Sequence, residues 1–266
     1  MQDLIKQVKK ATVFLGYYKE EKPVFTGTGF FVMVDKYFYL VTAKHVVNGL
    51  QGKDILIFLN SKKGKIITRS LKEIQEKYSA QWIYHKDPEV DIAIISFALN
   101  MDIDDVKTIP EDLFLDFKNV FELDDVFFLS YQPGVFNQKT IIPVIRKGCV
   151  SLKQDNKTIL IDGSAFPGNS GSPVFLTPMP SRFKDGGITL GDGGLGGKFV
   201  GIVGSYLPYQ EVAISQQTSR PRVIFEENTG LSTIWSVTCL EEIINSEVFQ
   251  KQLDRLKNKI SVPLST

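Results

Sequence analysis

The first hundred residues are a succession of short runs rich in valine, isoleucine, phenylalanine and tyrosine, separated by turn residues. Runs of this kind are typical of β-strands, and their close succession predicts a closed barrel or a sandwich and not a βαβ sheet. A turn signal at Val34–Tyr37 indicates a hairpin connection. The expected strands are Thr12–Tyr18, Thr28–Val34, Tyr37–Thr42, Asp54–Leu59, Ile66–Ser70, Ser79–Tyr84 and Asp91–Phe97.

Strand patterns resume after an acidic, irregular stretch at residues 101–120 that suits a connection between two halves. Apolar positions at helical spacing predict a short helix at residues 2–10 and an amphipathic C-terminal helix, packed on the second half, at residues 241–260. The strands expected between them are Asp125–Ser130, Ile141–Arg146, Cys149–Lys153, Thr158–Asp162, Pro173–Leu176, Phe199–Ser205 and Leu231–Val237.

Two long segments in the second half are expected to be loops. Residues 177–198 hold seven glycines and should be mobile, and residues 208–229 are expected to form a polar excursion. The glycine and aspartate spacing of the first segment does not fit a calcium-binding repeat, so we expect no metal.

Composition excludes several classes of function. A net charge of +1 gives no overall attraction to nucleic acid or anionic lipid, and no window is apolar enough to span a membrane. The N-terminus has no secretory signal pattern, and two cysteines, Cys149 and Cys239, are too few for a disulfide framework. We therefore expect a cytoplasmic protein without a cofactor, a nucleic-acid partner or a membrane span.

The chain has only two histidines, His45 and His85, and both precede the segment Phe166–Pro173, which contains Ser170. A serine hydroxyl becomes a nucleophile when a histidine, oriented by a carboxylate, takes its proton. An α/β-hydrolase needs that histidine after the serine, and a papain-like enzyme needs one after its cysteine. The order that remains is histidine, acid, serine.

Each candidate for a catalytic triad has a suitable local context. His45 follows an apolar strand, Asp91 opens another, and Ser170 follows Gly168 in a glycine-rich turn. Asp87 and Glu89 lie near Asp91 and are possible alternatives for the acid. His85 precedes a turn and is expected to have a surface or turn role, and Cys149 is expected to be a buried apolar residue.

The turn before Ser170 also predicts an oxyanion hole. Because Gly168 has no side chain, its backbone can adopt a conformation that points N–H groups inward. The expected donors are the backbone N–H groups of Gly168 and Ser170, since Pro167 has no N–H.

With these residues in view, the chain resembles the trypsin-like serine peptidases, especially the bacterial HtrA/Deg proteases. The resemblance covers about residues 24–245, and its motifs occur in the family's order: Thr26–Phe30, Thr42–Val47, Asp91–Ala93, Leu123–Val126, Gly148–Ser151, Ile161–Gly163, Pro167–Gly171 and Thr229–Leu231. It implies an all-β, chymotrypsin-like fold of two six-stranded antiparallel Greek-key barrels with N- and C-terminal helices. The implied peptidase unit spans 1–266, with barrels at 11–100 and 121–240.

The resemblance also has departures. Asn169 stands where zymogen-activated members carry aspartate, Val46 where secreted members carry cysteine, and Ser172 where glycine is usual. About twenty residues follow the closing strand, so no PDZ domain is expected.

The family's layout implies a substrate pocket formed by Ser164, Gly204, Ser205 and Tyr206. No carboxylate lies at the base position, which disfavours basic substrate side chains. The resemblance implies a serine endopeptidase acting on polypeptides, active by itself or latent until a regulatory protein partner orders the loops. The alternative is a regulatory or binding module with the same fold and little activity.

Overall fold

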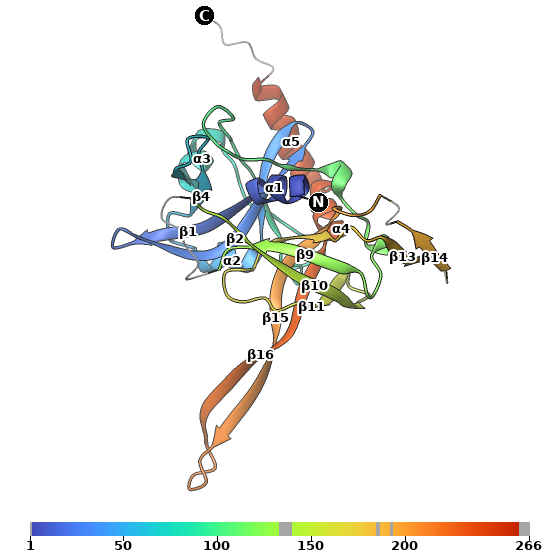
Figure 1. Cartoon of the computed structure of the whole chain (residues 1–266). Coiled ribbons are helices and arrows are strands. Elements are labelled where there is room, and N and C mark those ends of the chain that lie inside the picture. The colour runs from blue at the N-terminus through green and yellow to red at the C-terminus, as the bar shows by residue number, and fades with distance from the viewer. Residues whose placement is uncertain (1, 133–139, 185–186, 192–193, 261–266) are drawn as a thin grey trace, which may run out of the picture.

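The computed structural model describes residues 2–132, 140–184, 187–191 and 194–260 of the chain. Two β-rich halves lie side by side, with helix α1 (Gln2–Ala11) at one end of the chain and helices α4 (Val237–Ile244) and α5 (Glu247–Ile260) at the other (Figure 1). None of the helices in these ranges is long and apolar enough to cross a membrane. The mainly β, chymotrypsin-like architecture implied by the resemblance is confirmed.

The first half is a twisted antiparallel sheet with strand order β5-β4-β1-β2-β3-β7-β6, which β8 joins by a parallel pairing with β2. Its strands are β1 (Thr12–Lys19), β2 (Lys22–Val34), β3 (Tyr37–Thr42), β4 (Leu56–Asn60), β5 (Ile66–Ser70), β6 (Ile83–Tyr84), β7 (Ala93–Ser96) and β8 (Ile109–Pro110). The predicted hairpin at Val34–Tyr37 is confirmed. Asp35 and Lys36 both have positive φ, the geometry of a two-residue turn that matches strand twist.

The two ends of this sheet, β5 and β6, are consecutive along the chain and are separated by helix α3 (Leu71–Tyr78). The strand pairing therefore follows an open path among the described residues, whereas the resemblance implied a closed barrel of six strands. Helix α3 occupies the connection between these two strands, and the Ser70 side chain caps it by accepting a hydrogen bond from the Glu73 N–H at 3.3 Å.

The second half is a closed six-stranded barrel with order β10-β11-β16-β15-β12-β9. Its strands are β9 (Asp125–Ser130), β10 (Val144–Lys153), β11 (Thr158–Asp162), β12 (Pro173–Leu176), β15 (Phe199–Ile214) and β16 (Pro221–Ser236). Neighbouring strands are not always consecutive in sequence, because β16 returns to pair with β11. This crossing is the Greek-key feature that the family resemblance implied.

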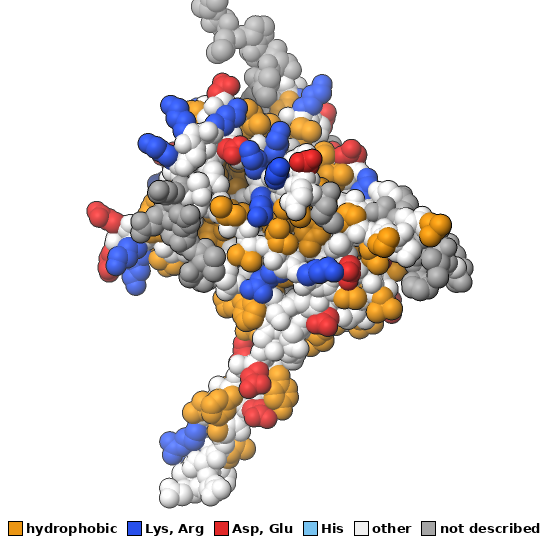
Figure 2. Space-filling model, viewed as in Figure 1, with side chains coloured by type: hydrophobic (Ala, Val, Ile, Leu, Met, Phe, Trp, Pro, Cys, Tyr) orange, Lys and Arg blue, Asp and Glu red, His pale blue; other side chains and the backbone are white. Residues whose placement is uncertain are grey.

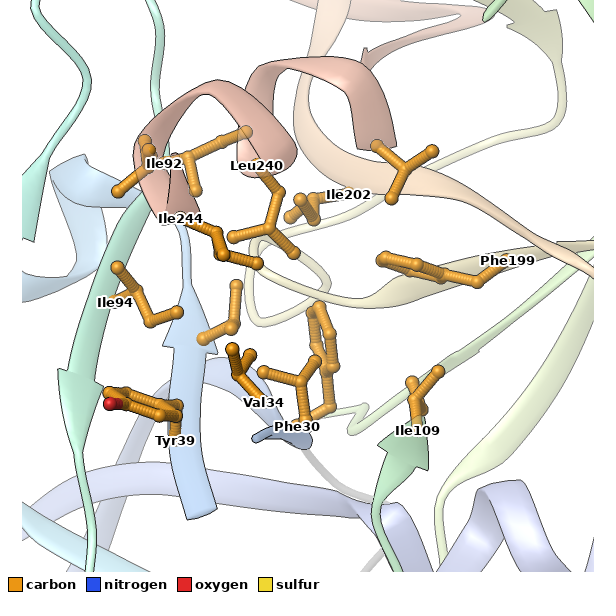
Figure 3. Packing of buried hydrophobic residues seen from close by; sticks show 14 of the residues in the cluster. Phe30, Val34, Tyr39, Ile92, Ile94, Ile109, Phe199, Ile202, Leu240 and Ile244 are labelled. Atoms are coloured by element: carbon orange, nitrogen blue, oxygen red, sulfur yellow. The ribbon is translucent and has the colours of Figure 1, made fainter. Parts of the chain in front are cut away.

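The halves share one apolar core. Figure 3 shows Phe30 and Tyr39 from the first half converging with Phe199 and Ile202 from the second on Leu240 of α4. All five side chains are fully buried. Burying a side chain of this size contributes about 1.5–3 kcal/mol, so the interface between the halves is a substantial part of the stability.

The C-terminal segment differs from the single helix expected at 241–260. It forms two helices, α4 and α5, with a break at Asn245–Ser246, where the Ser246 hydroxyl accepts a hydrogen bond from the Phe249 N–H at 3.3 Å. The Phe249 ring packs on Tyr39, with centroids 4.7 Å apart, so α5 contacts the first half as well as the second.

Both segments expected to be loops contain strands. Residues 177–198 include the hairpin of β13 (Ser181–Lys184) and β14 (Gly187–Leu190), while residues 185–186 and 192–193 of that segment lie outside the described residues. Residues 208–229 are the outer part of β15 and β16, which project from the body as a long two-stranded hairpin (Figure 1).

Candidate active site

His45 lies in the first turn of the short helix α2 (Lys44–Gly49), directly after β3. Ala43, fully buried, joins the strand to the helix in an extended conformation. The strand ends here because residues 44–49 form helix α2, whose Val46 and Val47 side chains pack into the core of the first half. The imidazole is thereby held at the rim of the first half, and its side chain is 52% exposed.

Asp91 is fixed against His45 by both carboxylate oxygens. Oδ2 lies 2.6 Å from His45 Nδ1, and Oδ1 accepts a hydrogen bond from the His45 backbone N–H at 2.8 Å. Because a carboxylate cannot donate, Nδ1 carries the proton and Nε2 is left as an acceptor. The Asp91 side chain is only 20% exposed, so this contact is largely protected from water. The two other acid candidates are not placed this way, since Asp87 accepts from the Glu89 N–H within its own turn.

Ser170 lies in a tight turn between β11 and β12, and Asn169 holds this turn in shape. Asn169 is fully buried. Its Oδ1 accepts from the Phe166 N–H at 3.0 Å, and its Nδ2 donates to the Tyr131 carbonyl at 3.2 Å. Asn169 therefore stabilises the turn, at the position where zymogen-activated relatives carry aspartate.

Two backbone N–H groups of this turn take no part in the hydrogen bonds that hold it among the described residues. The N–H groups of Asn169, Gly171 and Ser172 donate to main-chain carbonyls, and that of Phe166 donates to Asn169. Within the described part of the chain, the N–H groups of Gly168 and Ser170 have no partner. Gly168 has a φ of 95°, a conformation that favours glycine. These are the two donors that the sequence predicted for an oxyanion hole.

The turn that contains Ser170 is bonded to the first half through Thr28 of β2. The Thr28 N–H donates to the Ser170 carbonyl at 2.9 Å, and the Thr28 hydroxyl donates to the Gly168 carbonyl at 2.7 Å. A Cβ at Gly171 would overlap Thr28 O and Thr42 Oγ1 and would lie 3.0 Å from Ala43 N. The turn therefore packs on the end of the strand that carries His45. The structure brings the His45, Asp91 and Ser170 segments together at the junction of the halves.

The residues expected to form the substrate pocket come from β15 and from the segment that follows β11. Gly204, Ser205 and Tyr206 follow one another on β15, and Ser164 lies opposite Gly230 of β16, where an added Cβ would be 4.0 Å from Ser164 Oγ. Tyr206 donates from its hydroxyl to Glu226 of the projecting hairpin. This hydrogen bond raises the pKa of the Tyr206 hydroxyl and lowers the pKa of the Glu226 carboxyl.

Arg146 of β10 is a site residue that sequence reasoning did not identify. Its guanidinium donates to the Ser164 carbonyl at 3.3 Å and to Gln132 at 2.8 Å, and it lies 4.9 Å from the Phe166 ring centroid. Arg146 therefore supports the outer side of the turn that contains Ser170. An arginine in a barrel strand gives no local signal of this contact.

His85 lies beside a turn, one of the two roles expected for it, although its side chain is largely buried. Its side chain is only 6% exposed, and its Nε2 lies 2.8 Å from Glu242 of α4, which also pairs with Lys157. His85 Nδ1 accepts from the Asp87 N–H at 3.0 Å, so Nε2 is the donor to Glu242. Burial raises the pKa of Glu242, but the hydrogen bonds from Lys157 and His85 outweigh it and hold the pKa below its ordinary value.

The remaining titratable residues offer no metal site. Among the described residues, no group of three or more His, Cys, Asp or Glu side chains is arranged to hold an ion. Cys149 and Cys239 are free thiols, and burial raises the pKa of both. Cys239 is fully buried, whereas Cys149 is only half-buried, less than its mid-strand position suggested.

Comparison with known proteins identifies the family and the fold. The family model of the trypsin-like peptidase domain matches residues 27–177. A similar solved structure is that of the serine endoprotease from Yersinia pestis, with a TM-score of 0.53 and 16% sequence identity over 95% of this chain. The match covers 66% of that protein, slightly less than two thirds of its length. A search of curated protein sequences gives no significant match.

Proposed function

The chain belongs to the trypsin-like peptidase family, and from this premise we propose that it is a serine endopeptidase with a triad of His45, Asp91 and Ser170. The observation that carries the proposal is the contact of 2.6 Å between Asp91 Oδ2 and His45 Nδ1. It leaves Nε2 of the imidazole as a base. Another polar pair would serve equally well at this exposed rim if the His45–Asp91 contact were only structural.

In the proposed reaction, Ser170 Oγ attacks the carbonyl carbon of the scissile peptide and its proton passes to His45 Nε2. Asp91 holds the imidazole and stabilises its positive charge. The tetrahedral intermediate collapses, and the leaving amine takes the proton from Nε2, so that an acyl group stays on Ser170. A water molecule then gives its proton to Nε2 and attacks the acyl carbon. The carboxylic acid departs, and Ser170 regains its proton.

In this proposal the N–H groups of Gly168 and Ser170 donate hydrogen bonds to the carbonyl oxygen and stabilise the negative charge that develops on it. Their lack of other partners among the described residues supports the role, because donors already in place cost no rearrangement when the charge develops. The formed His45–Asp91 contact and the open pair of donors favour an active peptidase over a binding module or a form that waits for a regulatory partner.

The proposed pocket selects small or medium uncharged side chains. Ser164 places a hydroxyl at the base where a carboxylate would be needed for lysine or arginine. Tyr206, partly packed on the core of the second barrel, narrows one wall.

Labelling with a fluorophosphonate probe tests the proposal, because the probe reacts only with an activated serine. The wild type should be labelled, and Ser170→Ala and His45→Ala should not. His85→Gln, which alters the other histidine of the chain, is the matched control and should keep its labelling. Labelling that persists without Ser170, or a folded wild type that does not react, would overturn the proposal.

A further inference from the structure

The projecting hairpin formed by residues 207–229 is unusually apolar for a surface feature. Seven of the nineteen exposed large hydrophobic side chains among the described residues belong to it: Leu207, Tyr209, Val212, Ile214, Val223, Ile224 and Phe225. Ile224 is 61% exposed and Phe225 56% exposed. A two-stranded hairpin alone is only marginally stable in water, and an exposed apolar edge is a site of association.

Charge is arranged in bands along this hairpin. Figure 2 shows apolar side chains between acidic ones nearer the body and basic ones nearer the tip. The acidic band contains Glu211, Glu226 and Glu227, and the basic band contains Arg220 and Arg222. A second hairpin that runs in the opposite direction would place its basic band beside the acidic band of the first.

The outer edge of β16 is available for such a contact. β11 pairs with β16 only between Leu231 and Trp235, so the edge from Pro221 to Thr229 has no strand beside it among the described residues. The β15 edge is less suitable for self-pairing. Pro208 has no N–H there, and Glu211 is the only charged residue on the outer part of the strand.

We propose that the chain forms a two-fold symmetric dimer in which the β16 edges of two projecting hairpins pair antiparallel about Ile224. In this register Ile224 lies opposite Ile224 of the partner subunit. Arg222 then lies opposite Glu226 of the partner subunit, and Val223 lies opposite Phe225 of the partner subunit. The sequence Arg222–Glu226 is self-complementary because charges of opposite sign stand two residues either side of the central isoleucine.

The paired hairpins form a four-stranded sheet, and the apolar side chains of the two subunits join into one continuous apolar surface on it. Val212 is the cross-strand neighbour of Ile224, so one face carries a row of four apolar residues across the two subunits. The body of each subunit lies at the opposite end of the sheet. The dimer leaves free the β15 edge beside the turn that contains Ser170, where the Gly171 N–H donates to the Val203 carbonyl. The contact is small, so the dimer is weak and reversible.

Sedimentation of the full chain over a range of concentrations tests the dimer. The wild type should change from monomer to dimer as concentration rises. Arg222→Glu and Glu226→Arg should each weaken the dimer by about tenfold or more, because the symmetry counts every charge contact twice. The variant with both changes restores opposite charges and should dimerise as the wild type does. Val248→Lys, which alters an exposed apolar residue of α5, is the control and should have no effect.

Crosslinking tests the register. In a Cys149→Ser background, Ile224→Cys places two Cβ atoms about 4.5–5.5 Å apart, and a small approach of the strands brings them to the roughly 3.5–4.5 Å of a disulfide, so oxidised glutathione should link the subunits. Val212→Cys lies on the same face but two strands further from its counterpart and should not crosslink. A wild type that stays monomeric, a double charge variant without recovery, or equal crosslinking of both cysteine variants would overturn the inference. None of these results depends on peptidase activity.

Discussion

Replacing Asp91 by asparagine tests the triad through the two bonds that this side chain makes. One carboxylate oxygen accepts from the His45 backbone N–H at 2.8 Å, and the other from the imidazole Nδ1–H at 2.6 Å. The amide of Asp91→Asn has one oxygen and one NH2 group. Its oxygen should stay with the backbone N–H, because the opposite orientation sets two donors face to face and leaves one unsatisfied, at a cost of about 1–3 kcal/mol.

This orientation changes the tautomer of the imidazole. The NH2 group then donates to Nδ1, so the ring proton moves to Nε2, and Nε2 can no longer accept the proton of Ser170. General-base catalysis contributes roughly 10²–10⁴ in rate, and kcat should fall by that factor. KM should change little, since Asp91 lies behind the imidazole and does not reach the substrate. Folding should be nearly unaffected, because both bonds have replacements in the variant.

The assay is steady-state hydrolysis of a peptide substrate, with a thermal melt of each variant to confirm the fold. Asp87→Asn is the matched control, since Asp87 is a nearby aspartate that bonds only within its own turn, and it should keep wild-type kcat. If Asp91→Asn retained most of the wild-type kcat, or if Asp87→Asn lost activity to the same extent, the assignment of the acid would be refuted.

The two remaining predictions concern the junction of the halves and the substrate pocket. Glu242→Gln should lower the free energy of unfolding at pH 7 by about 0.5–1 kcal/mol, because the pairing with Lys157 is lost and water screens both partly exposed side chains. The pKa of Glu242 is lowered from 4.5, so its contribution is present above pH 4.5 and is lost as pH falls through the folded pKa. The pKa of Lys157 is raised from 10.5, chiefly by its bond to Glu242, so its contribution is present below pH 10.5 and is lost as pH rises through the folded pKa. Urea unfolding of both proteins should show a gap at pH 7 that shrinks at acid pH, and a gap of equal size at both would contradict this account. Cleavage of a peptide library should occur after small or medium uncharged residues such as alanine or valine, and a profile dominated by lysine or arginine would show that the base of the pocket is not Ser164.

Much of the architecture could be predicted from the sequence because it depends on local patterns. Short apolar runs between turn residues gave most strand positions, and the Val34–Tyr37 connection had the residues of a tight turn. The scarcity of histidine reduced the catalytic candidates to one order along the chain. The mutual approach of the His45, Asp91 and Ser170 segments, by contrast, is a contact between distant segments that no local pattern encodes.

Three features differ from the prediction, each for its own physical reason. The projecting hairpin has no buried face, so its strands lack the alternation of apolar and polar residues that identifies a strand in a core. Helix α3 carried a signal that was overlooked, since Ser70 and Glu73 have the spacing of a capping box. The burial of His85 could not be predicted, because its partner Glu242 lies 157 positions away in sequence.

Thr28 has a consequence for how the molecule matures. Both of its bonds to the turn that contains Ser170 come from the half that lacks Ser170, so they add to the bonds that Asn169 makes from within the second half. A newly made chain whose second barrel had closed first would carry the serine without these two bonds and without His45 and Asp91 beside it. Under the proposed mechanism, such a chain has no peptidase activity until the two halves have packed together. The completion of folding would therefore itself switch the activity on.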